Sequence, residues 1–407
     1  MNAPTPTASR WLLGVAVLLI ALNLRPTITG VGPLLSQISA TLGTTEAALG
    51  ALAAVPLIAF AVVSPLAHGL SARFGIPRTV LWSLLLLGVG TVVRSLPGFA
   101  ANLWVGTALI GASIAIVNVL MPAVIKRDFA DRVPAMTAVF TACLSGMGAV
   151  ASGVVVPISL IEVNGAALGW QVALVWTGAL LPFALGAWVA SMRRQPRHEK
   201  PTERSGATGI WRDRLAWQVL LYMGLQSMTF YMLVTWLAPI AQSLGRSEVV
   251  AGIDVMIYQL FCFGGSLIVP LILRGRFRRF AAAFVPAVTL IGIAGLIALP
   301  ELFTLWAVLC GIGCGAALGM ALSLFSLRAR THHAAGALSG MAQSGGYLIA
   351  ATGPILFGAL VTWSGGWLAS LILVALVLIG QLVTGLFVGR DRFVLERAYS
   401  SPPARRP

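Results

Sequence analysis

An arginine stands in the middle of the first long apolar segment, in the stretch ALNLRPTITGVGPLL at residues 21–35. Arg25 lies near the centre of the apolar segment 11–37, roughly 20 Å from each end of a helix that rises 1.5 Å per residue. A guanidinium keeps its proton, and a charge at that depth costs from about 3 to more than 10 kcal/mol on an isolated helix. The side chain must therefore face a water-filled cavity or a partner.

Two chemical roles fit such an arginine. It forms an ion pair that locks two helices together, or it stands uncompensated in a cavity and binds an anion through its planar fork of donors. Of the twelve acidic residues, only Asp254 lies inside an apolar segment, since Glu46 and Glu248 are the first residues of theirs, at the outer loops. This shortage of acidic partners favours binding of a small anion or polar substrate, with the structural ion pair as the alternative.

The residues around Arg25 add polar groups and a weak point in the helix. Pro26 lacks a backbone N–H and frees a carbonyl one turn earlier, which loosens the helix at this position. Asn23 and Thr29 supply neutral hydrogen-bonding groups within about one turn of Arg25. Packing and kink geometry explain these residues equally well, so their contact with a substrate is one of two open interpretations.

The other polar residues of the apolar segments are uncharged. Most lie in the second half of the chain, where Gln226 is adjacent to Ser227, the position 202 residues after Arg25. Interhelical hydrogen bonds are the alternative role for each of them. Together they predict that Arg25 supplies the charge of a binding site and that neutral donors complete it. The candidates are Asn118, Tyr222, Gln226, Tyr258, Gln259, Gln343 and Tyr347.

Asp254 is a candidate for proton coupling. Burial disfavours the charged form of a carboxylate, so a carboxyl group inside a membrane segment can take up and release a proton. The alternatives are a helix residue near the membrane surface and a partner for Arg25 or Arg94. Protons are therefore a possible coupling ion.

The composition indicates the elements that position these side chains. The 407 residues are 58% hydrophobic and only 10% charged, whereas soluble domains carry about 25% charged residues. Twelve apolar windows are long enough to cross a bilayer as helices, and the alternation typical of a membrane β-barrel is absent. The expected spans are 11–37, 46–70, 78–97, 101–125, 134–158, 168–190, 215–243, 248–273, 280–299, 302–325, 335–361 and 366–388.

The basic residues indicate the orientation in the membrane. Of the 27 lysines and arginines, all but Arg25, Arg94 and Arg246 fall in segments that the twelve spans place on one side. The positive-inside rule assigns that side, and both termini, to the cytoplasm of a bacterial inner membrane. The net charge of +15 is thus a topology signal, and we expect no nucleic-acid partner.

The two halves of the chain repeat one another. LGTTEAALG at 42–50 recurs as LGRSEVVAG at 244–252, and Leu103-Trp104 recurs 202 residues later as Leu305-Trp306. Six spans per repeat is an even number, so both halves keep the same orientation and hold a substrate between them. We expect a first half at 1–190, a basic cytoplasmic linker at 191–214, a second half at 215–389 and a cytoplasmic tail at 390–407.

This organisation resembles the major facilitator superfamily. The stretch HGLSARFGIPR at 68–78 is similar to its G-x-L-A-D-R-x-G-R-R-type loop, with His68 and Ala72 departing from the pattern. Within the superfamily, LNLRPTITGVGPLL at 22–35 and MPAVIKRDF at 121–129 resemble the cyanate and 2-nitroimidazole transporter family. The resemblance implies twelve helices and transport of a small, compact molecule. The expected gating residues of the loops are Arg73, Arg78, Lys126 and Arg127.

Other functional classes lack their chemistry in this sequence. No G-x-x-x-x-G-K-[ST] motif for ATP occurs, so a gradient drives transport or the protein is a facilitator. An integral-membrane enzyme or sensor would need a Ser/His, metal or carboxylate pair inside the bundle. We expect a monomer that is not an enzyme, has no cofactor or metal, and moves a cyanate-like solute by alternating access. Efflux of small drugs such as nitroimidazoles is the alternative.

The charge distribution predicts which loops a thiol reagent reaches. The variant Glu203→Cys should react with a membrane-impermeant maleimide only after the membrane is permeabilised, because the linker is cytoplasmic. The variant Glu162→Cys should react in intact cells. The native chain is the control for labelling of the four native cysteines. Labelling of Glu203→Cys in intact cells would contradict the predicted orientation.

Overall fold

Helices form nearly the whole structure. The computed structural model describes residues 6–192, 209–274 and 278–396, so most of the predicted linker and part of the predicted tail lie outside the described residues. Twelve helical segments of the described chain are long and apolar enough to cross a membrane, as the sequence predicted. A short antiparallel hairpin pairs β1 (Glu162–Val163) with β2 (Ala166–Ala167).

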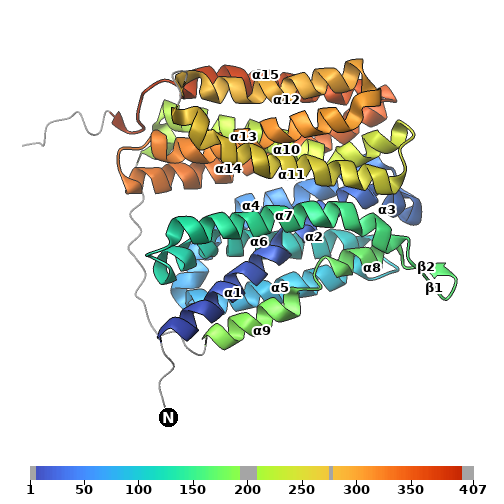
Figure 1. Ribbon diagram of the computed structural model, residues 1–407, viewed down its shortest axis with the longest axis horizontal. Helices are drawn as coiled ribbons and strands as arrows, with labels where there is room; N and C mark the ends of the chain where they lie inside the picture. Colours follow the sequence, from blue (N-terminus) through green and yellow to red (C-terminus); the bar gives the residue numbers. More distant parts are fainter. Residues whose placement is uncertain (1–5, 193–208, 275–277, 397–407) are drawn as a thin grey trace, which may run out of the picture.

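The first half of the chain forms the lower group of helices in Figure 1. Its first span is divided into the 19-residue α1 and three short helical pieces, and its sixth span is divided into two helices. The elements are α1 (Pro6–Leu24), α2 (Pro26–Thr29), η1 (Gly32–Leu34), α3 (Leu35–Leu42), α4 (Glu46–Phe74), α5 (Ile76–Ser95), α6 (Ala100–Asp128), α7 (Val133–Ser159), α8 (Gly169–Trp176) and α9 (Leu181–Met192).

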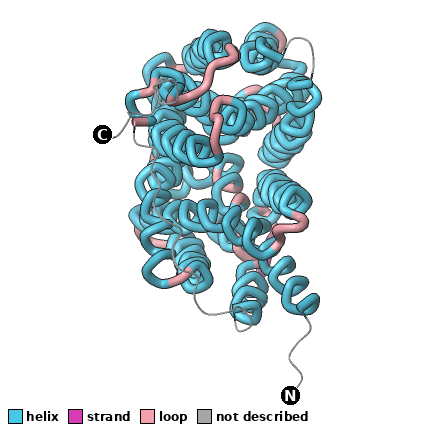
Figure 2. The backbone as a smooth tube through the Cα atoms, turned by 90° about the vertical axis from the view of Figure 1, so that its left-hand side faces the viewer, coloured by secondary structure: helices cyan, strands magenta, loops and turns pink. Residues whose placement is uncertain are grey.

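The second half forms the upper group, and Figure 2 views both groups nearly along their helices. Each of its six spans is a single long helix. The elements are η2 (Ile210–Arg212), α10 (Arg214–Ser243), α11 (Glu248–Arg274), η3 (Arg278–Phe280), α12 (Ala281–Ala298), η4 (Pro300–Leu302), α13 (Phe303–Leu327), α14 (His332–Ser364) and α15 (Leu368–Val388).

The same pattern of helix packing occurs in both halves. In the first half α6 packs on α4 and α5, and α1 packs on α7 and α9. In the second half α13 packs on α11 and α12, and α10 packs on α14 and α15, which are the equivalent spans of the repeat. Between the halves, α4 lies along α14 and α7 lies along α11. The arrangement confirms two six-helix parallel repeats, while the boundaries at 190 and 214 stay predictions.

The helix ends follow the local sequence. Thr45, Asp213 and Thr331 accept hydrogen bonds through their side chains from backbone N–H groups of the first turns of α4, α10 and α14. Gly75 ends α4 with a φ of 83°, a conformation that favours glycine, and Pro77 follows in the first turn of α5. These residues set the lengths of the helices that surround the centre.

The first span breaks where the sequence places Arg25 and Pro26. Residue 25 lies in a turn between α1 and α2, and its carbonyl accepts from the N–H groups of Ile28 and Thr29 at 3.0 Å each. The chain then continues through Gly30 and Val31 to η1. Irregular backbone at membrane depth is tolerated only where protein or a water-filled cavity surrounds it. The break must therefore be surrounded by protein or line a cavity.

The halves are in close contact at the end of the molecule away from the basic loops. A Cβ added to Gly50 of α4 would lie 2.6 Å from the Trp236 ring, and one added to Gly252 of α11 would lie 2.9 Å from the Ser152 carbonyl. The Gln37 side chain donates to the Glu248 carboxylate across the halves at 2.6 Å. We call this end the closed end.

The halves are further apart at the other end, which carries the described basic loops and which we call the basic end. A Cβ added to Gly69 of α4, or to Gly336 or Gly340 of α14, would have no atom within 4 Å. At Gly50, α4 also meets α14, because a Cβ added there would lie 2.8 Å from the Pro354 carbonyl, whereas the glycines near the other ends of both helices face open space. The structure is that of a two-part bundle joined at one end.

Bulk placed at Gly50 should force the closed end apart. The variant Gly50→Leu has no room beside Trp236 and Pro354, whereas Gly336→Leu is the control because nothing surrounds that position. Spin labels are attached at Ala101→Cys and Glu301→Cys, one in each half, in a chain without its four native cysteines. We expect the distance between the two labels to increase for Gly50→Leu only. An unchanged distance distribution would show that the contact at Gly50 does not hold the halves together.

Candidate functional site

A central cavity lies between the two halves at the level of Arg25. It encloses about 550 Å³ of empty space, counting its open mouth. The first half contributes residues from α1, α2, α4, α6 and α7, and the second half contributes residues from α10, α13 and α14. The lining residues are Leu24, Arg25, Ile28, Phe60, Ile114, Asn118, Leu144, Gln226, Ser227, Phe230, Tyr231, Leu318 and Tyr347.

Arg25 is the cationic residue of this cavity. Its guanidinium carbon lies 5.0 Å from the centre of the Phe230 ring on the opposite half, in cation–π contact. Gly148 of α7 makes room for its stem, because a Cβ there would lie 2.6 Å from Arg25 Cγ. No ion pair joins Arg25 to any carboxylate of the described residues. The structural ion pair considered from the sequence is absent from this part of the chain.

Neutral polar groups share the cavity with Arg25. Asn118 lies on α6, and Gln226, Ser227 and Tyr347 lie on helices of the second half. The Gln226 amide nitrogen is 3.4 Å from the Ser227 hydroxyl, while the buried Gln226 carbonyl oxygen has no partner among the described residues. The structure therefore brings together one cation and several uncharged hydrogen-bonding groups, as the sequence predicted for Arg25, Asn118, Gln226 and Tyr347.

Aromatic rings enclose the same space. Phe60 of α4 meets Tyr347 of α14 edge to face at 5.3 Å between ring centres, so this pair spans the two halves. Phe230 meets Tyr231 edge to face at 5.1 Å on α10. The site thus combines one guanidinium with flat, weakly polar walls, which suits a small planar or linear molecule with a negative end.

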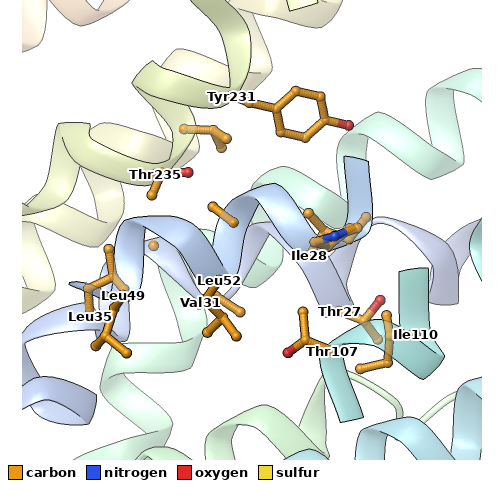
Figure 3. A pocket seen from close by; sticks show the side chains of 14 residues that line it. Thr27, Ile28, Val31, Leu35, Leu49, Leu52, Thr107, Ile110, Tyr231 and Thr235 are labelled. Atoms are coloured by element: carbon orange, nitrogen blue, oxygen red, sulfur yellow. The ribbon is translucent and has the colours of Figure 1, made fainter. Parts of the chain in front are cut away.

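A second cavity lies on the side of the closed end (Figure 3). Ile28 and Tyr231, from opposite halves, line both this cavity and the central one, so their side chains stand between the two spaces. The remaining walls are mostly apolar, with Thr27, Thr107 and Thr235 as the hydroxyl groups. This arrangement separates the central cavity from the closed end by a layer of side chains.

Asn23, Thr29 and Gln259 lie behind the cavity wall. Asn23 donates to the Leu19 carbonyl at 2.7 Å, and Thr29 donates to the Gly148 carbonyl at 2.8 Å. The Gln259 amide donates to the Ser152 hydroxyl at 2.5 Å, which links α11 to α7. None of these three residues lines the cavity. Asn23 is bonded within α1, whereas Thr29 links α2 to α7 and Gln259 links α11 to α7. Their predicted contact with a substrate stays untested.

Tyr222, Tyr258 and Gln343 also lie outside the lining. Tyr222 is fully buried beside Gln381 of α15. Tyr258 stacks on Phe230 at 6.1 Å, one layer behind the ring that contacts Arg25. Gln343 donates to the Ser339 hydroxyl at 2.8 Å on its own helix. The sequence left an interhelical hydrogen bond open for Gln343, whereas the bond in the structure lies within α14.

Asp254 is paired with Arg246. The Arg246 guanidinium lies 2.7 Å from one Asp254 oxygen, and the Thr304 hydroxyl donates to the other at 2.7 Å. Neither Arg25 nor Arg94 is its partner, which corrects that interpretation of the sequence. Since the carboxylate is buried and bonded on both oxygens, it must break these contacts to carry a proton. Proton coupling through Asp254 stays a prediction.

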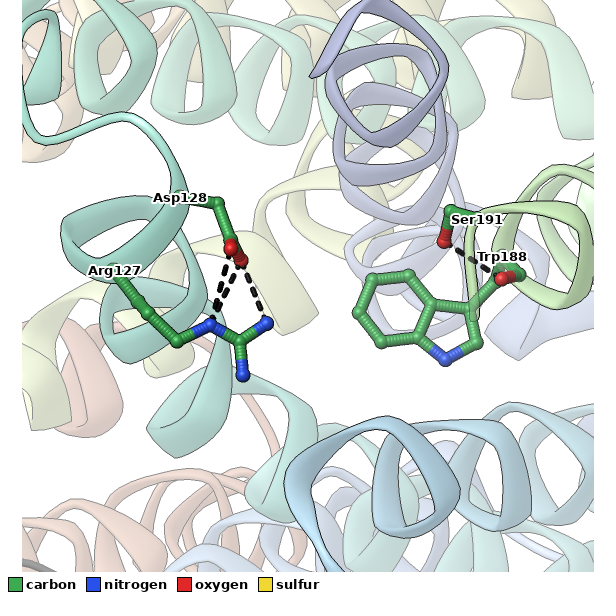
Figure 4. A network of polar contacts seen from close by, with 4 residues as sticks. All are labelled: Arg127, Asp128, Trp188 and Ser191. Atoms are coloured by element: carbon green, nitrogen blue, oxygen red, sulfur yellow. Dashed lines mark hydrogen bonds and ion pairs between the residues drawn. The ribbon is translucent and has the colours of Figure 1, made fainter. Parts of the chain in front are cut away.

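The four predicted gating residues lie at the basic end. Arg127 forms an ion pair with its neighbour Asp128 at 2.7 Å, shown in Figure 4 together with the bond between Ser191 and Trp188 on α9. Arg73 lies over the ring of its neighbour Phe74 at 5.2 Å. Arg78 and Lys126 are exposed. These contacts stay within the first half, and a gating role for the four residues remains a prediction.

Sequence reasoning missed the aromatic residues of the cavity. Phe60, Phe230 and Tyr231 are apolar or nearly apolar, so composition alone does not separate them from residues that face lipid or core. One signal was present, because Phe230 follows Gln226 by four positions and so shares its helix face.

Known proteins are similar to this sequence over most of its length. A family model described as Major Facilitator Superfamily matches residues 13–351. The 2-nitroimidazole transporter of Escherichia coli is 40% identical, over 94% of this chain and 97% of that protein. The cyanate transport protein of the same organism is 30% identical, over 93% of this chain and 97% of its own length.

The fold is also similar to that of a solved structure. A bacterial homologue of the human lysosomal transporter Spinster, in an inward-facing and unoccupied conformation, superposes with a TM-score of 0.77. The two chains are 14% identical, and the superposition covers 97% of this chain and 99% of the other. At that identity the likeness concerns the fold alone.

The Arg246–Asp254 pair predicts the stability of variants. Arg246→Met leaves a buried carboxylate without its cation and should lower the free energy of unfolding by about 3–5 kcal/mol. Adding Asp254→Asn should recover part of that loss, with a coupling of about 1–3 kcal/mol in detergent unfolding measurements. The control cycle pairs Arg25→Met with Asp254→Asn and should be additive within about 0.5 kcal/mol. A larger coupling in the control cycle would mean that Arg25 is the partner.

Proposed function

Because this chain belongs to the major facilitator superfamily, we propose that it is a secondary active or facilitative transporter of a small anion or small polar compound. The solute is cyanate-like in this proposal and moves by alternating access between the two halves. The names of the relatives, a cyanate transport protein and a 2-nitroimidazole transporter, support a small and compact solute.

The unpaired guanidinium of Arg25 carries the proposal. A half-buried cation without a carboxylate is unfavourable unless water or an anion compensates it, and the mostly apolar lining of the cavity strengthens its attraction for a negative group. An anion in contact with Arg25 would lie near the hydroxyl and amide groups of Gln226, Ser227 and Tyr347 on the other half. A solute bridging the halves in this way would couple its binding to their relative movement.

The aromatic walls favour a second candidate function, proton-coupled efflux of small nitroaromatic drugs. Phe60, Phe230, Tyr231 and Tyr347 form flat surfaces around Arg25, and a nitro group carries partial negative charge on its oxygens. A planar ring between these side chains would place those oxygens at the guanidinium. The two candidates share Arg25 and differ in whether the solute needs the rings.

The positions of the halves suggest one state of the transport cycle. If the basic end faces the cytoplasm of a bacterial inner membrane, as the positive-inside rule predicts, the structure is inward-facing. Solute would then exchange between the central cavity and the cytoplasm, while the layer at Ile28 and Tyr231 blocks the opposite route. Alternating access requires the contacts at Gly50 and Gly252 to open and the basic ends to approach each other.

Substitution of Arg25 tests the proposed function. Arg25→Ala should abolish uptake into proteoliposomes while the protein still inserts and elutes as a single species, because no carboxylate loses its partner. Arg25→Lys keeps the charge but loses the fork, so the apparent KM should rise by about tenfold, as loss of a charged hydrogen bond implies. Solutes for the assay are radiolabelled cyanate, thiocyanate, nitrate and 2-nitroimidazole.

The matched control is Arg274→Ala, which removes the same charge from an exposed position near the end of α11. Its uptake should equal that of the native chain. Normal uptake by a well-folded Arg25→Ala would refute the proposed role of Arg25. Among the solutes, transport of 2-nitroimidazole without transport of the anions would favour the drug-efflux alternative. Replacing Phe230 by Leu should then impair the transport of 2-nitroimidazole.

A further inference from the structure

A second arginine contacts the broken segment that carries Arg25. Arg94 lies one residue before the end of α5 and is fully buried, with 0% of its surface exposed. Its Nη1 atom donates to the backbone carbonyl of Thr27 at 2.5 Å, across 67 residues of sequence. No ion pair joins Arg94 to an acidic residue in the described ranges. Its recorded partner is therefore the backbone of α2.

The Thr27 carbonyl needs this partner because the helix ends around it. In a continuous helix the Val31 N–H would donate to Thr27, but here it donates to the Ile28 carbonyl at 3.4 Å. The Gly30 N–H donates to the Pro26 carbonyl at 3.0 Å. A backbone carbonyl freed at this depth is costly unless another group bonds it. Arg94 supplies that bond with a charged donor, which makes it one of the stronger kind.

The contact fixes a segment that begins at Arg25. On its other side, α2 is bonded to α7, where Thr29 Oγ1 donates to the Gly148 carbonyl at 2.8 Å and Ser152 Oγ donates to the Thr29 carbonyl at 3.1 Å. The short helix is thus held between α5 and α7, directly after the residue whose side chain enters the cavity. Without the contact to α5, one of its two attachments is lost.

The packing around Arg94 fixes its direction. A Cβ added to Gly106 of α6 would lie 2.5 Å from Arg94 Cβ and 2.6 Å from its Cα. The backbones of α5 and α6 therefore approach closely at this position and leave the Arg94 stem little freedom. A guanidinium that is rigidly aimed provides a firmer attachment than a flexible surface side chain.

Stability alone does not account for an arginine here. Its Nε and Nη2 atoms are buried without a partner in the described part of the structure. Burying an under-bonded guanidinium is unfavourable, and apolar residues of similar volume often replace buried charges with a gain in stability. The benefit of Arg94 must then come from its bond to the Thr27 carbonyl, which holds α2 in place.

We propose that Arg94 is a positioning residue for Arg25. Through the Thr27 carbonyl it keeps the broken segment in one place, so that the Arg25 guanidinium is already aligned in the cavity before a solute arrives. Preorganisation lowers the cost of ordering on binding and so raises affinity. The inference rests on the proposed role of Arg25, but the fixed position of α2 can be measured without any solute.

The test combines hydrogen exchange of the purified protein in detergent with uptake into proteoliposomes. In Arg94→Met, amide exchange in residues 26–31 should rise by about tenfold, as loss of one charged hydrogen bond implies. The apparent KM for the transported solute should rise by a similar factor, with the maximal rate within about twofold of native. Arg94→Lys keeps a charged donor and should recover most of both losses.

The matched control is Thr91→Val on the same helix face. Thr91 is also buried, but its hydroxyl donates to the Leu87 carbonyl of its own helix at 2.8 Å and not to α2. This variant should disturb α5 while exchange in residues 26–31 and the KM stay native. Equal exchange in residues 26–31 for Arg94→Met and Thr91→Val would overturn the inference.

The outcomes separate this inference from the proposed function. Normal uptake by Arg25→Ala would refute the proposed function. Increased amide exchange in Arg94→Met would still show that Arg94 fixes the position of α2. If Arg94→Met does not fold, Arg94→Lys carries the test, since its single-point donor should raise both exchange in residues 26–31 and the KM by about threefold. A raised KM with native exchange in that variant would also overturn the inference.

Discussion

One uncompensated guanidinium at the centre of a membrane bundle determines how the rest of the molecule is built. Arg25 has no carboxylate partner in the described chain, and lipid would not solvate it, so the two halves must enclose a cavity around it. Two other arginines outside the basic loops are bonded within the protein. Arg246 is neutralised by Asp254, and Arg94 is bonded to a backbone carbonyl. We propose that the positive charge in the cavity is therefore available to a solute.

The broken first span and the continuous seventh span give the two halves different tasks. Pro26 interrupts the helix beside Arg25, and contacts from α5 and α7 on either side hold the resulting short segment. The equivalent region of α10 is one unbroken helix that presents Gln226, Ser227 and Phe230 to the cavity. In this proposal the first half supplies the charge beside the short helix α2, which is bonded on both sides. The second half supplies neutral donors and aromatic rings from one continuous helix. A solute that contacts both would favour their approach.

The sequence predicted the twelve spans, the repeat and the position of the cavity, because membrane-spanning helices and a buried charge leave strong compositional signals. It also indicated the break at Pro26. It did not identify Arg246 as the partner of Asp254, since Arg246 lies in a loop that the spans alone leave without a structure. The bond from Arg94 to Thr27 joins residues distant in sequence, and no residue pattern reveals which carbonyl a helix break will free. The aromatic residues of the cavity wall, such as Phe60 and Phe230, were missed because phenylalanine is common on every face of a membrane helix.

The central claim is that Arg25 binds the negative end of a small solute between the halves, and a crystal soaked in selenocyanate tests it most directly. Selenocyanate is a linear pseudohalide whose selenium scatters anomalously. The account predicts an anomalous peak inside the central cavity, with the nearest atom of the anion about 3 Å from the Arg25 guanidinium. An anomalous peak only elsewhere on the molecule, with the space beside Arg25 filled by water alone, would contradict it.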